Sequence, residues 1–205
     1  MRYSGRVFPL VLCLTATFFA GAASASAQSV TYGVHSPQLS EIENLTARAM
    51  QLHSSGNAKA AVPVFKKAAD KARRHFGASH PKFARTLNNL AIAYDLTGAL
   101  DRAEKSYRQA IAIVAAHQDA RQQQLANLEN NLAAVVLQQC RIADAHDLYR
   151  QALVRAQAAL GAGHADTVMM RRNVERLDRY LGAPQPASTD DLSGDFNKLL
   201  QRCLS

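Results

Sequence analysis

Residues 84–114 read ARTLNNLAIAYDLTGALDRAEKSYRQAIAIV, and this stretch decides the fold. In each half the apolar residues recur at the i, i+3, i+4, i+7 spacing of a single helix face. They are Leu87, Leu90, Ala91 and Tyr94 in the first half, and Ala103, Tyr107, Ala110 and Val114 in the second. Gly98 lies between the halves, where a glycine adopts the left-handed conformation that ends a helix, and Asp101 is expected to help start the next helix. The stretch therefore predicts two helices joined by a tight turn.

The same pattern recurs along the chain with a period of 42 residues. The matching positions hold glycine or cysteine, asparagine, alanine, and an aromatic residue. These columns are Gly56, Gly98, Cys140 and Gly182; Asn89, Asn131 and Asn173; Ala49, Ala91 and Ala133; Ala61, Ala103 and Ala145; and Phe65, Tyr107 and Tyr149. Small alanines let two helices approach closely, and the aromatic residue one turn later fills the remaining gap. Such a period indicates stacked copies of one helical unit, and therefore an all-α fold.

We expect helix pairs at 40–54 with 58–76, 82–97 with 101–117, and 122–139 with 143–160, followed by a single helix at 165–181. Ser40 and Glu43 have the spacing of a capping box, which places the start of the first helix. The segment 117–122 contains neither glycine nor proline, so a continuous helix from 101 to 138 is the alternative. That helix would leave the apolar faces of two repeats in water, and we therefore favour separate helices.

The run Leu87-Asn88-Asn89-Leu90-Ala91 with its following Tyr94 and Gly98 resembles the tetratricopeptide repeat, and in particular the 42-residue variety of kinesin light chains. The segments 76–81 (FGASHP) and 160–166 (LGAGHAD) are similar to the loop between repeats of that variety, where Gly-x-x-His-Pro is usual. The resemblance is weaker at Arg48 and Glu175, which replace a leucine and an alanine. It implies a short right-handed α-solenoid of antiparallel helix pairs, with repeats at about 40–80, 81–121 and 122–163 and a capping helix at 164–182.

The chain has 205 residues, of which 48% are apolar, and a net charge of +8, which suits a helical core and excludes a disordered chain. Residues 1–27 have the order of an export signal, with two arginines, an apolar run, and Ala25-Ser26-Ala27. We expect cleavage after Ala27, an N-terminal lead at 28–39 and a periplasmic or secreted product. An uncleaved membrane anchor and a lipid on Cys13 are the alternatives. No later segment approaches membrane-spanning length without charges.

If the helix pairs stack as the resemblance implies, one face of each first helix lines a concave groove. The predicted groove residues are Arg85, Asn89, Ile92, Asn127, Asn131, Arg172, Asn173 and Arg176. An asparagine amide both donates and accepts hydrogen bonds, so a ladder of them suits the main chain of an extended peptide. In kinesin-light-chain-like repeats the matching asparagines contact cargo peptide, which is what the resemblance implies here.

Each part of this groove has an alternative explanation. The asparagines are equally suited to satisfying polar groups of loops or neighbouring helices. The arginines of the last repeat helix either form a solvated face or bind a carboxylate through bidentate contacts. A second basic set belongs to the helix at 58–76 and is expected on the convex side, where it aids solubility. Its members are Lys66, Lys67, Lys71, Arg73 and Arg74.

Several classes of function have no support in the sequence. Catalytic and nucleotide-binding motifs are missing, and carboxylates such as Glu43, Asp70 and Glu129 are expected on polar helix faces, so we expect neither an enzyme nor a cofactor. No His-x-x-x-His pair is present, so no metal site is expected, and His80 and His164 are expected to have structural roles between repeats. Export and the lack of an interleaved aromatic platform argue against nucleic-acid binding.

Residues 183–205 form a polar linker and a short C-terminal helix with one apolar face. This face consists of Leu192, Phe196, Leu199, Leu200 and Cys203. The helix either caps the open end of the solenoid or lies in the groove, where Asp190, Asp191 and Asp195 would face the arginines. Cys140 and Cys203 form a disulfide with each other, form intermolecular bonds, or remain free thiols, and the sequence leaves these three possibilities open.

Taken together, these features predict an exported, non-catalytic adaptor whose concave face binds a peptide or protein. Its partner is unknown, and the arginines favour an acidic one. The alternative is a structural subunit of an envelope assembly that associates with copies of itself through the exposed ends of its repeats.

Overall fold

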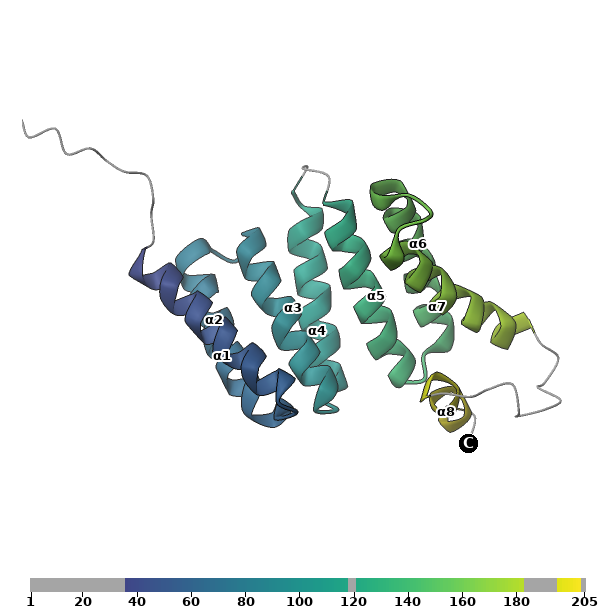
Figure 1. Ribbon diagram of the computed structural model, residues 1–205, viewed down its shortest axis with the longest axis horizontal. Helices are drawn as coiled ribbons and strands as arrows, with labels where there is room; N and C mark the ends of the chain where they lie inside the picture. Colours follow the sequence, from purple (N-terminus) through teal and green to yellow (C-terminus); the bar gives the residue numbers. More distant parts are fainter. Residues whose placement is uncertain (1–35, 118–120, 183–194, 204–205) are drawn as a thin grey trace, which may run out of the picture. The chain divides into compact units, whose positions relative to one another are not determined.

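The computed structural model describes residues 36–117, 121–182 and 195–203 (Figure 1). These residues form eight α-helices and no β-strand. The helices are α1 (Pro37–Ser54), α2 (Ala58–Phe76), α3 (Pro81–Leu96), α4 (Leu100–Ala115), α5 (Gln122–Gln138), α6 (Ile142–Leu160), α7 (Ala165–Gly182) and α8 (Asp195–Arg202). The expected export signal at 1–27, with Cys13, and most of the linker before α8 lie outside the described residues. None of the helices in the described part of the chain is both long and apolar enough to cross a bilayer.

Successive helices pack against one another along the chain (Figure 1). α1 with α2, α3 with α4, and α5 with α6 form the antiparallel pairs, and contacts of α2 with α3, α4 with α5, and α6 with α7 join the pairs in series. This arrangement is the expected all-α, right-handed α-solenoid. A continuous helix from 101 to 138 is excluded, because α4 ends at Ala115 and α5 begins only at Gln122.

Alanines and aromatic residues at the 42-residue spacing form the core of each helix pair. Their side chains are almost completely buried: all the alanines of the two columns have an exposed fraction of 0%, and the aromatic residues are at most 4% exposed. The alanines are Ala49, Ala91 and Ala133 on the first helices and Ala61, Ala103 and Ala145 on the second helices. An alanine at a helix crossing leaves room for close approach, and the aromatic ring one turn later closes the gap beside it. The packing predicted from the repeat is confirmed.

One of the predicted helix starts, that of the first helix, is wrong. α1 begins at Pro37 and not at residue 40, so the expected lead is shorter than 28–39. The capping residue is Ser36, whose Oγ accepts a hydrogen bond from the Leu39 N–H at 3.1 Å, and a proline fits the next position because no N–H is needed there. α4 follows Ala99 without a side-chain cap, and Asp101 lies inside its first turn, where it interacts with the helix dipole. The other boundaries agree within two residues.

His80 and His164 have the structural role that was expected of them. The Nδ1 atom of His80 accepts a hydrogen bond from the Lys82 N–H at 3.0 Å, immediately before α3. The Nδ1 atom of His164 accepts one from the Asp166 N–H at 3.2 Å, at the start of α7. Each imidazole therefore satisfies an N–H group at a helix start that lacks a partner within the helix.

The third repeat contains a partly buried ion pair. Glu129 of α5 is only 4% exposed, which corrects the expectation that its carboxylate lies on a polar face. Arg155 of α6 donates through Nε to both of its carboxylate oxygens at 3.0 Å, and through Nη1 to Gln122 Oε1 at 2.7 Å. Burial raises the pKa of Glu129, and the Arg155 guanidinium opposes that rise. The pair ties the start of α5 to the middle of α6.

Replacing Arg155 with methionine should destabilise the protein by about 3 kcal/mol, because a buried carboxylate then lacks its cation. The pKa of Glu129 should rise further in this variant. The folded state of the variant then binds more protons than its unfolded state. The loss of stability should therefore grow as pH increases from about 4 to 8. Urea unfolding at several pH values measures this change. Adding Glu129→Gln to Arg155→Met should recover part of the stability. Equal losses of stability in the single and the double variant at every pH would contradict the conclusion that Arg155 stabilises the buried carboxylate of Glu129.

Candidate functional site

An open cleft lies between the N-terminal halves of α3 and α5, and we call it the α3–α5 cleft. Its volume is about 580 Å³, within the usual range for ligand sites. The lining residues come from the start of each helix and from the residue before it. They are His80, Pro81, Lys82, Arg85 and Asn88 on the α3 side, and Arg121, Gln123, Gln124, Asn127 and Leu128 on the α5 side. The cleft is open to solvent, which suits an extended segment of another chain.

The lining of the α3–α5 cleft is cationic. It includes Lys82, Arg85 and Arg121, and none of the described residues of this lining is an aspartate or glutamate. Lys82 Nζ is 5.0 Å from the centroid of the Phe76 ring, so the aromatic face helps to position this ammonium group. Burial and the nearby charges, Lys82 first among them, lower the pKa of His80, so its imidazole is neutral at pH 7. An anion in the cleft would therefore meet two guanidinium groups and an ammonium group.

The asparagines of the ladder, Asn89, Asn131 and Asn173, are half-buried, and two of them are hydrogen-bonded to asparagines outside the ladder. The Asn173 amide donates a hydrogen bond to Asn130 Oδ1 at 3.0 Å, which links α7 to α5. The Asn88 amide donates to Asn89 Oδ1 at 3.3 Å within α3. Asn173 thus has the neighbouring-helix role that was the alternative to peptide contact. Asn127, by contrast, is exposed and lines the α3–α5 cleft.

A second polar link joins the C-terminal ends of α3 and α5. The Gln138 amide donates to Asp95 Oδ1 at 2.6 Å. Burial raises the pKa of Asp95, and the Gln138 hydrogen bond opposes that rise. Burial together with the negative charge of Asp95 raises the pKa of Tyr149 to about 12, and the positive charge of Arg176 partly offsets this effect. Asp95 and Gln138 therefore form a polar link at the ends of α3 and α5 opposite the α3–α5 cleft, and the charge of Asp95 is felt at Tyr149.

Of the predicted groove residues, the structure brings Arg85 and Asn127 together in the α3–α5 cleft. The others do not line it: Asn89 and Asn131 are half-buried, Ile92 packs against the core, and Arg172 and Arg176 are exposed on α7. Their contact with a peptide stays a prediction.

Sequence reasoning missed the other polar residues of the α3–α5 cleft. They are His80, Lys82, Asn88, Arg121, Gln123 and Gln124. A signal for them exists, because neither 77–94 nor 120–128 contains an acidic residue. Arg121 lies just before one helix start, and Lys82 lies in the first turn of the other. Two such starts side by side predict a positive surface.

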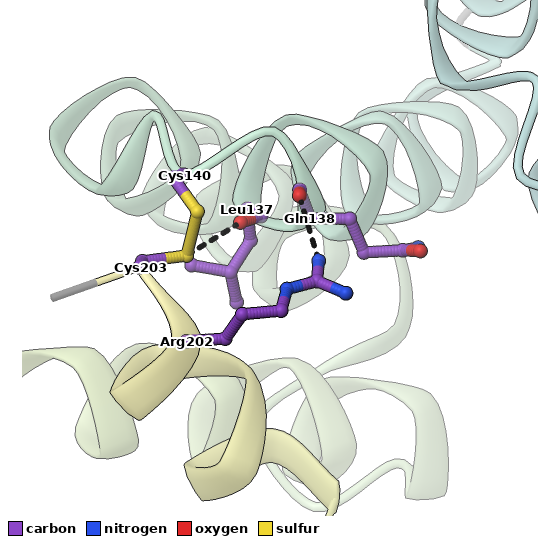
Figure 2. Close-up of a disulfide and its surroundings, with 5 residues drawn as sticks. All are labelled: Leu137, Gln138, Cys140, Arg202 and Cys203. Carbon is purple, nitrogen blue, oxygen red and sulfur yellow. Dashed lines mark hydrogen bonds between the residues drawn. A yellow bond between two sulfur atoms is a disulfide. The ribbon is translucent and has the colours of Figure 1, made fainter. Parts of the chain in front are cut away.

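The C-terminal helix α8 lies beside the C-terminal end of α5 and is joined to it by a disulfide between Cys140 and Cys203 (Figure 2). Cys140 occupies the position that glycine holds at Gly56 and Gly98, and its φ of 62° is left-handed. A side chain in that conformation costs about 1 kcal/mol relative to glycine. The disulfide offsets this cost.

α8 has eight residues, which is too short for a helix to be stable on its own in water. Among its described side chains Leu200 is buried, at 4% exposure, and Leu199 is half-buried. Burial of one leucine contributes about 2 kcal/mol. The disulfide is the covalent tie that keeps this short helix beside α5.

The chain is similar to known families and structures over most of its described part. Residues 29–116 and residues 130–166 match two models of the tetratricopeptide repeat. Kinesin-light-chain TPR-like repeats of Podosopora anserina are 17% identical, with a TM-score of 0.65 over 83% of this chain and 76% of that one. The translocator chaperone SycD of Yersinia enterocolitica type III secretion is 15% identical, with a TM-score of 0.55 over 69% of this chain and 86% of that one. The Sgt2 TPR domain of Aspergillus fumigatus is 16% identical, with a TM-score of 0.52 over 76% and 92%.

These three structures show that the fold is shared. No curated protein has significant sequence similarity to the chain.

His80 provides a test of the electrostatics of the cleft. Its pKa is lowered from the usual 6.5, so between that value and the lower folded pKa the unfolded state binds more protons. Stability should therefore fall as pH decreases through this window. His80→Asn keeps a capping side chain but does not titrate, so its free energy of unfolding should fall less than that of the wild type between pH 8 and pH 5. Urea unfolding at both pH values gives this comparison, and identical pH slopes would argue against a depressed pKa.

Proposed function

Because the chain belongs to the tetratricopeptide-repeat family, we propose that it is an exported, non-catalytic adaptor that holds an acidic segment of a partner protein in the α3–α5 cleft. The observation that carries this proposal is the lining of the cleft, which holds Lys82, Arg85 and Arg121 and, in the part of the chain that the structure describes, no carboxylate. Guanidinium groups bind carboxylates through two parallel hydrogen bonds, which fixes the orientation of the bound group.

The amides of the cleft complete the site for a peptide. Asn88, Gln123, Gln124 and Asn127 supply donors and acceptors beside the cations. A peptide main chain presents the complementary groups at every residue, so these amides suit binding that depends little on the particular side chains. The cations then select a segment that carries negative charge.

Export is supported by two features of the chain. Residues 1–27 have the order of a signal peptide, and the described part contains the Cys140–Cys203 disulfide. Disulfides persist mainly in oxidising compartments, such as the periplasm or the extracellular space. A partner would therefore be met outside the cytoplasm.

Neutralising the cleft should weaken binding of an acidic peptide at least tenfold. The test variant combines Lys82→Gln, Arg85→Gln and Arg121→Gln. The matched control combines Lys66→Gln, Lys67→Gln and Arg74→Gln on the exposed face of α2, which changes the net charge by the same amount. Fluorescence anisotropy with a labelled glutamate-rich peptide measures both affinities, and circular dichroism checks the helix content.

The control should keep the affinity of the wild type apart from a small electrostatic loss that disappears as salt is added. Equal losses in the two variants at all salt concentrations would show that net charge, and not the cleft, governs the binding. In that case the proposed peptide site would have to be abandoned.

Self-association is the second candidate function, and exposed apolar residues on the terminal helices of the array favour it. Met50 on α1 and Leu181 on α7 are 51% and 50% exposed. Contacts between such ends would extend the array from one copy to the next. Sedimentation velocity over a hundredfold concentration range separates the two candidates, because an adaptor stays monomeric whereas a self-associating subunit sediments faster at high concentration.

A further inference from the structure

α8 covers part of the face that the repeat predicts to be a groove. Shifting Ile92 and Leu96 by 42 residues gives Ala134 and Gln138 on α5, and these two residues lie in the seat of α8. The seat also includes Leu137 of α5 and Tyr149 of α6. It lies at the C-terminal end of α5, whereas the α3–α5 cleft lies at its N-terminal end. The seat is therefore a separate site.

The seat has an apolar part and a rim of hydrogen-bond acceptors that carry partial negative charge. Ala134, Leu137 and Tyr149 provide the apolar part. The rim consists of the last backbone carbonyl groups of α5, where the helix dipole is negative. Arg202 of α8 donates through Nη2 to the Gln138 carbonyl oxygen at 3.1 Å, as Figure 2 shows. A ligand helix with a leucine in the apolar part and a cation three residues later, as Leu199 and Arg202 are in α8, satisfies both parts.

α8 fills this seat incompletely. A space of about 500 Å³ remains between α8 and the third repeat, bordered by Ala134, Gln138 and Tyr149 and by Lys198, Leu199 and Arg202 of α8. Leu200 is the one described side chain of α8 that is fully buried. A longer helix with larger apolar side chains would therefore bury more surface in the same seat than α8 does.

The bond that holds α8 is open to attack by a reductant. Cys140 is exposed at the turn between α5 and α6, and Cys203 is half-buried, with its Sγ 3.8 Å from the Leu137 carbonyl oxygen. A thiolate approaching from solvent therefore reaches Cys140 more readily. Thiol exchange proceeds at the sulfur that is accessible.

We propose that the seat of α8 is a docking site for an amphipathic helix of a partner protein, and that the Cys140–Cys203 disulfide keeps it closed. The partner helix carries large apolar residues on one face and a cation about one turn after the first of them, as Leu199, Leu200 and Arg202 do in α8. Opening the disulfide releases α8, because it removes the covalent tie of a helix of only eight residues, which is marginally stable by itself. The partner helix then takes its place.

The opening step needs a dithiol reductant. One thiolate of the dithiol attacks Cys140 Sγ, which breaks the Cys140–Cys203 bond and leaves Cys203 as a thiolate that takes up a proton. The second thiol of the reductant then attacks the mixed disulfide and releases Cys140, which is also protonated. Two electrons and two protons have moved to the protein, and the dithiol has become a disulfide.

The test uses the full chain and a hydrocarbon-stapled helical peptide of residues 195–203 in which serine replaces Cys203. The staple removes the cost of forming the helix, so the peptide reports on the seat alone. Isothermal titration should show that the oxidised protein binds the peptide weakly or not at all. The affinity for the peptide should be at least tenfold higher after treatment with dithiothreitol, and also in the Cys203→Ser variant without reductant. Hydrogen exchange of the α8 amides should become fast under the same two conditions.

The variant Ala134→Arg in the Cys203→Ser background should lose peptide binding, because its side chain fills the seat. Ala112→Arg on the exposed face of α4 is the matched control and should keep it. Equal peptide affinity before and after reduction, no binding in either state, or α8 amides that stay protected after reduction would each overturn the proposal. The affinity for the glutamate-rich peptide, measured on the same samples, reports on the α3–α5 cleft independently.

Discussion

The close approach of helices at completely buried alanines is the constraint on which the structure depends. Ala91 and Ala133 on the first helices, and Ala103 and Ala145 on the second helices, have no exposed surface. A larger side chain at any of these crossings would separate the helices and remove contacts on both sides. Each pair buries its apolar face only with the help of its neighbours, so the spacing set in one pair is transmitted to the next. The 42-residue period of the sequence is thus a packing requirement repeated along the chain.

This regular spacing also determines which polar groups meet. Asp95 with Gln138, and Asn130 with Asn173, are hydrogen-bonded pairs whose members are each 43 residues apart. The same relation between first helices places the starts of α3 and α5 side by side and forms the cationic α3–α5 cleft. At the other end of α5 the face is covered by α8, and the disulfide holds the cover in place. One helix therefore borders a cationic cleft at one end and has a covered, apolar face at the other.

The sequence predicts the helices well, because burial at a fixed spacing decides them. It predicts the start of α1 poorly, because Ser36 and Ser40 are both suitable caps and only the Ser36 hydrogen bond to Leu39 distinguishes them. Glu129 was misplaced because its burial depends on Arg155, a residue on another helix. Lys82 and Arg121 were not predicted as site residues for the same reason. They come together in one cleft only because the starts of α3 and α5 lie side by side. The seat of α8 follows from a bond between residues 63 positions apart, which no local pattern specifies.

The most direct test of close packing at the alanines is to place the same larger side chain at a buried and at an exposed alanine of one helix pair. Ala91 lies at a helix crossing in α3, and Ala112 lies on the exposed face of α4. Urea unfolding should show that Ala91→Leu lowers the free energy of unfolding by about 1–3 kcal/mol, whereas Ala112→Leu changes it by less than about 0.5 kcal/mol. Equal effects of the two substitutions would contradict the claim that close packing at the alanines sets the arrangement of the repeats.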